Sequence, residues 1–242
     1  MQTEIRITDI PVKNSCGGWL SVMEKTKLPF GIRAARNAEL NKGLLLIAFG
    51  YIFCYLFMLD YSVEGMSIFY RWSTTSYSQF KHPALFAVWV ILCSSAFFLN
   101  IGYLRGKYGA TQKWLSVLQY AGFSFLILSM VVPTHHAPHI TLSHYLHYYV
   151  HLFGAMFFAL SNLACVLGVF GYKMKTDKRF KYWLWGGIVF MLTVGPFFAV
   201  KLCGFIETAP MLFMMAVLYL LNYTNLMDAK MEAEQQVYET KV

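Results

Sequence analysis

Six long apolar stretches dominate the sequence and decide what it can fold into. They cover residues 43–60, 83–103, 113–132, 144–171, 182–203 and 206–223. A helix of roughly 20 mostly apolar residues crosses the roughly 30 Å hydrocarbon core of a bilayer. Within lipid, a spanning segment must satisfy its own backbone hydrogen bonds, and a helix does so. The sequence therefore predicts an all-α fold, a polytopic membrane protein whose six helices form a transmembrane bundle.

Composition supports the membrane class and argues against a nucleic-acid partner. The chain is 57% hydrophobic and 13% charged, whereas soluble domains are about 25% charged. The net charge of +8 would suit nucleic acid if it formed one patch, but the basic residues lie in short segments between the apolar stretches. The scattered cysteines form neither a disulfide framework nor a CxxC metal pattern.

The last two apolar stretches are separated by a short polar break. Four residues interrupt the apolar run there, namely Lys201, Gly204, Glu207 and Pro210. A single helix over both stretches would exceed about 40 residues, which at about 1.5 Å per residue is too long to cross a bilayer once. We therefore expect two helices joined by a tight turn. One long bent helix, giving five spans, is the alternative.

The positions of lysine and arginine predict the orientation. If both termini lie on the same side, all of the 20 Lys and Arg residues except Arg71, Lys81 and Lys201 fall on that side. Such residues are enriched in cytoplasmic segments, so we expect the N-terminus and the C-terminus to be cytoplasmic. This gives a cytoplasmic N-terminal tail over 1–42, a six-span domain over 43–223 and a cytoplasmic C-terminal tail over 224–242. The N-terminal tail mixes apolar and basic residues, so it lies either on the cytoplasmic leaflet or in water.

Histidines are concentrated before and within the fourth apolar stretch. All of them except His82 lie in one short region, at His135, His136, His139, His144, His147 and His151. The last three share one helix face, and His147 and His151 have the spacing at which two imidazoles can hold one metal. A catalytic zinc would need a third ligand, from the loop histidines, Asp60 or Glu207. A metal-free polar cluster, and interfacial histidines that bond to headgroups or water, are the alternatives.

Other titratable residues also gather toward the predicted outer side. With the histidines, they make up a candidate polar cluster of His144, His147, His151, Glu207, Asp60 and Lys201. Charged groups at membrane depth are costly and usually face the bundle interior. We therefore expect a polar cavity open to the outer leaflet, lined by His147, His151, Glu207 and Asp60. Lys201 and Glu207 flank the break and are alternatively a structural ion pair. The inner half carries the amides of Asn100, Gln119 and Asn162 instead.

The C-terminal residues match a known type of peptide ligand. Thr240 stands two residues before the terminal Val242, the pattern of tails that PDZ domains bind as an added strand. A PDZ-domain protein is therefore an expected partner at the cytoplasmic side.

Two segments resemble the damage-regulated autophagy modulator family. One runs from His147 to Phe158 as HYYVHLFGAMFF, and the other is GFIE at Gly204 to Glu207. The superfamily includes six-span Golgi proteins that support GPI-anchor lipid remodelling and plasma-membrane regulators of phosphoinositide kinase localisation. The resemblance implies a six-span layout with both termini on the cytoplasmic side. It marks His151 and Glu207 as the positions that correspond to the family's motif residues. The segment 61–82 departs from it, because it lacks the expected Pro- and Glu-rich stretch.

The function expected from these features is that of a lipid-linked regulator or adaptor. Its setting would be the Golgi, the lysosome or the plasma membrane, in autophagy, GPI-anchor maturation or phosphoinositide regulation, with membrane lipids as partners. A metal-dependent lipid hydrolase using His147, His151 and a carboxylate is the alternative. A small transporter or channel ranks third, because only Gly195 and Pro196 suggest a broken helix.

Overall fold

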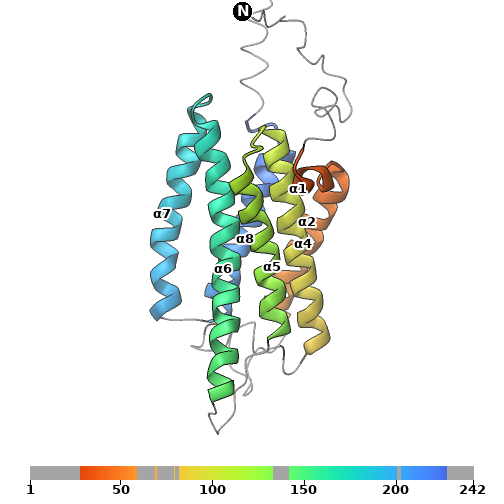
Figure 1. Cartoon of the computed structure of the whole chain (residues 1–242), viewed down its shortest axis with the longest axis vertical. Coiled ribbons are helices and arrows are strands. Elements are labelled where there is room, and N and C mark those ends of the chain that lie inside the picture. The colour runs from red at the N-terminus through yellow and green to blue at the C-terminus, as the bar shows by residue number, and fades with distance from the viewer. Residues whose placement is uncertain are drawn as a thin grey trace, which may run out of the picture.

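The computed structural model describes residues 28–58, 69, 79, 82–132, 142–200 and 203–227, and its regular elements over these residues are helices. Long helices run side by side in a bundle, with α7 at one edge next to α6 (Figure 1). The elements are α1 (Phe30–Ala34), α2 (Ala38–Met58), α4 (Pro83–Lys107), α5 (Lys113–Val131), α6 (Leu142–Lys173), α7 (Arg179–Val200) and α8 (Gly204–Tyr223). The fold class is therefore the predicted all-α polytopic bundle.

Among the residues that the structure describes, five helices have the length and apolar composition to cross a membrane: α2, α4, α5, α6 and α8. The count of six spans stays a prediction. The other long helix, α7, spans 22 residues and corresponds to the fifth predicted stretch. It is separate from α8, as expected for two helices rather than one long bent helix. Pro196 lies inside α7, which continues to Val200, so the Gly195-Pro196 pair does not end this helix.

One end of the bundle brings together the end of α4, the end of α8 and the start of α7. Lys107 Nζ donates a 3.0 Å hydrogen bond to the carbonyl of Leu221, and Arg179 Nη2 donates one of 2.7 Å to the carbonyl of Met227. The turns after α4 and α6 lie at this same end (Figure 1). Every Lys and Arg that the structure describes is found here, so we call it the basic end. It is the end that the charge distribution predicts to be cytoplasmic.

The segment before α2 packs into the basic end. Leu28, Ile32 and Ala35 are buried, and Gly31 lies against Gly102 of α4 so closely that a side chain at Gly102 would collide with the Gly31 carbonyl. Small residues allow such close backbone approach. The described part of the predicted N-terminal tail is thus folded against α4, and α2 begins at Ala38, earlier than expected.

Glycines also bring α5 and α6 together. A Cβ at Gly154 would lie 3.0 Å from the Phe125 carbonyl, and one at Gly168 would lie 2.6 Å from Leu115 Cδ2. Larger residues at either position would push α6 away from α5. This contact matters for the site, because it fixes the part of α6 that carries His151.

Candidate functional site

The predicted histidine face lies on α6, as the spacing of its members required. His151 is buried, with 5% of its surface exposed, and His147 is half-buried one turn earlier. His144 belongs to the first turns of the same helix, and its side chain lies outside the described residues. The helix therefore places the histidines on one face.

His151 joins α6 to the end of α5. Its Nδ1 lies 2.7 Å from the carbonyl oxygen of Ser129 and 3.1 Å from that of Val132. Because both contacts are acceptors, the bonded tautomer carries its proton on Nδ1 and donates it. Ser129 Oγ in turn donates to the His151 carbonyl at 3.3 Å. This reciprocal bonding at buried positions gives His151 a structural role.

Glu207 lies in the first turn of α8, half-buried, with its backbone N–H donating to the Cys203 carbonyl at 2.9 Å. Over the described ranges, no three His, Cys, Asp or Glu side chains come together as a metal-binding group. The zinc hypothesis at His147 and His151 therefore depends on a ligand elsewhere in the chain. It stays a prediction, as does the outer polar cavity.

Several predicted site residues fall outside the described residues. They are Asp60, Lys201, His135, His136 and His139, together with Thr240 and Val242 of the proposed PDZ ligand. The ion pair expected between Lys201 and Glu207 and the PDZ interaction both stay predictions.

A buried arginine, which sequence reasoning counted only as a cytoplasmic charge, organises the basic end. Arg105 is fully buried on α4 and donates to Gln119 Oε1 at 2.7 Å and Ser116 Oγ at 2.9 Å. Its Nε and Nη2 reach the carbonyls of Ala110 and Gln112 at 3.1 and 3.2 Å. Gln119 extends this hydrogen-bond network, since its Nε2 donates to the Phe98 carbonyl at 2.6 Å. This network stabilises the turn between α4 and α5.

A second polar connection centres on Asn100 of α4. Asn100 Nδ2 donates to the Asn41 carbonyl of α2 at 3.1 Å, and Asn222 Nδ2 of α8 donates to the Asn100 carbonyl at 3.0 Å. The Tyr223 hydroxyl donates to Asn100 Oδ1 at 2.6 Å. Because buried amides must be hydrogen-bonded, these bonds fix the positions of α2, α4 and α8 relative to one another. Of the amides predicted in the inner half, Asn100 and Gln119 thus join helices, whereas Asn162 Nδ2 donates to the Phe158 carbonyl of its own helix.

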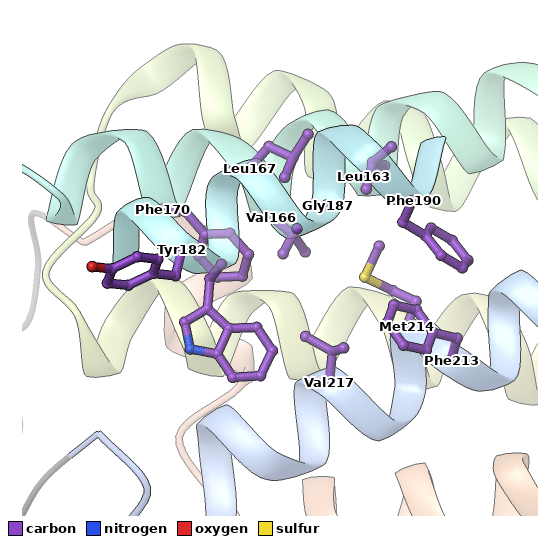
Figure 2. A pocket seen from close by; sticks show the side chains of 12 residues that line it. Leu163, Val166, Leu167, Phe170, Tyr182, Gly187, Phe190, Phe213, Met214 and Val217 are labelled. Atoms are coloured by element: carbon purple, nitrogen blue, oxygen red, sulfur yellow. The ribbon is translucent and has the colours of Figure 1, made fainter. Parts of the chain in front are cut away.

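An apolar groove lies between α6, α7 and α8. Its volume is about 310 Å³, and side chains from all three helices point into it (Figure 2). The lining residues are Leu163, Val166, Leu167, Phe170, Tyr182, Trp183, Gly186, Gly187, Phe190, Phe213, Met214 and Val217. We call this site the α6–α7–α8 groove. No local sequence pattern predicted it, because it forms only where three helices meet.

The two ends of the groove differ. Tyr182 and Phe190 lie at opposite ends (Figure 2), separated by about 12 Å at 1.5 Å of rise per helical residue. Phe190 stacks on Phe213 with ring centroids 4.4 Å apart. Tyr182 lies one turn from the start of α7, at the basic end. The groove therefore runs from the basic end toward the middle of the bundle.

Comparisons with known proteins add no relative. No protein-family model, curated protein or solved structure matches the chain. The resemblance to the damage-regulated autophagy modulator family stays a prediction from the two short segments.

Proposed function

We propose that this protein binds a membrane lipid in the α6–α7–α8 groove and acts as a lipid-responsive regulator or adaptor. The groove is the observation that carries the proposal. Its volume of about 310 Å³ falls at the lower end of the range for ligand sites. The cellular setting implied by the sequence resemblance, namely autophagy, GPI-anchor maturation or phosphoinositide regulation, is part of this proposal.

The lining selects an apolar ligand. Aliphatic and aromatic side chains make up nearly all of it, including Phe170, Trp183 and Phe213. Lipid tails are as apolar as leucine, so moving a tail from bilayer to groove yields little hydrophobic gain. The gain comes from dispersion contacts with closely packed walls, which are individually small and collectively large. An acyl chain is the apolar molecule that a bilayer supplies at high concentration at this depth.

The groove also offers a way for a bound lipid to change the protein. Its occupant touches α7 together with α6 and α8. The start of α7 is tied to the segment after α8 by the Arg179 bond to Met227. A lipid with different affinity for two positions of α7 would shift the balance between them. That shift would reach the basic end, where a cytoplasmic partner can bind.

The experiment fills the groove. Gly186 is a lining residue of the groove, and a Cβ there would meet no atom within 4 Å, so Gly186→Leu begins its side chain in open space. Gly50→Leu is the matched control, because Gly50 is exposed on α2 and a Cβ there also meets nothing within 4 Å. Purified protein in nanodiscs is exposed to a phospholipid with a photoreactive acyl chain, and crosslinked peptides are mapped by mass spectrometry.

We expect wild type and Gly50→Leu to crosslink at the helices that line the groove. Gly186→Leu should crosslink about tenfold less, equivalent to about 1.4 kcal/mol of lost binding. Equal crosslinking in all three proteins, or crosslinks spread evenly over the bundle surface, would refute lipid binding in the groove.

A further inference from the structure

Positive charge stands at the mouth of the groove. Lys173 follows Phe170 by three residues on α6, and Lys178, in the turn directly before α7, precedes Tyr182 by four. Residues three and four apart on a helix are neighbours on its surface. Lys178 is exposed and Lys173 is half-buried, so the stem of Lys173 packs on apolar surface while its ammonium can reach water.

The acidic residue of this turn does not offset these lysines. Asp177 is held by Arg179, whose Nη2 lies 2.7 Å from Asp177 Oδ2 and whose Nε lies 3.0 Å from the same oxygen. Arg179 Nη2 also donates to the Met227 carbonyl at 2.7 Å. The Arg179 guanidinium thus bonds to groups of the protein itself and neutralises the charge of Asp177. The remaining described charges of this turn are those of Lys173, Lys175, Lys178 and Lys181, and among these Lys173 and Lys178 stand three and four residues from the lining residues Phe170 and Tyr182.

We propose that the groove selects an anionic glycerophospholipid of the cytoplasmic leaflet, one acyl chain lying between α6, α7 and α8 and the net negative headgroup contacting Lys173 and Lys178. This inference rests on the proposed function, because it names the lipid class for the same groove. The apolar lining contacts the tail, and the lysines contact the negatively charged headgroup. Tyr182 and Trp183 stand between them, at the level where aromatic side chains favour the boundary of lipid and water.

The double substitution Lys173→Gln with Lys178→Gln tests the headgroup contact. Arg179 is left in place because the fold uses it. The control is Lys42→Gln with Lys113→Gln, which removes the same charge from the same end of the bundle, in the second turn of α2 and at the start of α5. Binding of phosphatidylserine and of phosphatidylcholine with identical chains is measured by native mass spectrometry on the purified full chain.

Each basic residue at a membrane surface strengthens anionic lipid binding by about fivefold. We therefore expect the groove variant to lose about thirtyfold in phosphatidylserine binding and little in phosphatidylcholine binding, while the control keeps its preference. Equal binding of the two lipids by wild type would overturn the inference, and so would an equal loss in the control. The proposed function would still stand in either case if Gly186→Leu reduces binding of both lipids. Displacement of both by cholesterol would show that the groove takes a sterol, which also overturns the headgroup inference.

Discussion

The guanidinium of Arg105 donates a 2.7 Å hydrogen bond to Oε1 of Gln119, and this bond joins α4 to α5 inside the bundle. The arginine is fully buried. Among the described residues, its hydrogen-bond acceptors are an amide, a hydroxyl and two backbone carbonyls, all of them neutral. A buried charge is tolerated only when hydrogen bonds replace its hydration. The positions of α4 and α5 are therefore set by the need to solvate Arg105.

Replacing Gln119 by leucine should destabilise the bundle by about 2–3 kcal/mol, because it leaves a buried charged donor without its closest partner. Gln112→Leu is the control: within the part of the chain that the structure describes, only its backbone carbonyl accepts from Arg105, and its buried Oε1 has no hydrogen-bond partner. Thermal unfolding of the purified proteins in detergent measures the difference. Equal transition temperatures for Gln119→Leu and wild type would show that the network does not stabilise the fold.

The helices could be predicted from the sequence because each apolar stretch is long enough to cross a bilayer. Its backbone groups must then form hydrogen bonds within the segment, which a helix provides. The role of Arg105 in joining α4 to α5 could not be predicted from the sequence. A basic residue at the end of a stretch is normally a cytoplasmic loop charge, and only the turn after α4 brings carbonyls back to it. That turn uses Gly109 at a positive φ of 69°, a conformation that glycine adopts without strain.

The candidate sites likewise combine features that local sequence periodicity predicts with features that only helix packing determines. The spacing of His147 and His151 placed them on one face of α6, since helical periodicity is local. That His151 is tied to the Ser129 carbonyl depends on how α5 ends against α6, which no local pattern records. The α6–α7–α8 groove was harder still to predict from the sequence, because its walls come from three helices and consist of ordinary apolar residues.

Substitutions at His151 should separate a structural role from a metal-binding one. Asparagine can place a donor near the position of Nδ1, whereas leucine cannot. We expect His151→Leu to lose about 1–2 kcal/mol of stability, as for a buried bond with its acceptors left unpaired, and His151→Asn to retain most of it. Thermal unfolding and elemental analysis are measured together. Near-stoichiometric zinc in wild type, lost in both variants, would instead support the metal site.

Impermeant thiol labelling tests the orientation. In a chain whose native cysteines are replaced by alanine, Thr176→Cys lies in the turn between α6 and α7, and Ser73→Cys lies in the segment predicted to be outside. In intact cells an impermeant maleimide should label Ser73→Cys and spare Thr176→Cys until the membrane is permeabilised. The reverse pattern would place the basic end outside and remove the cytoplasmic leaflet as the lipid source.

The ring stack of Phe190 on Phe213, with centroids 4.4 Å apart, should limit the length of chain that the groove accepts. Phe190→Ala removes one ring at the end away from Tyr182 and extends the space toward the middle of the bundle. Unfilled apolar space is costly, so a longer chain that fills it should bind more tightly. Phe197→Ala is the control, because Phe197 is on the same helix, 52% exposed, and is not among the lining residues.

Native mass spectrometry with phospholipids that differ only in chain length gives the readout. We expect the preferred chain to lengthen in Phe190→Ala, with the longer lipid gaining about tenfold, or about 1.4 kcal/mol. The Phe197→Ala profile should match that of wild type. A Phe190→Ala profile that also matches wild type would mean that the acyl chain does not reach the ring stack, and that the lipid is held only near the basic end.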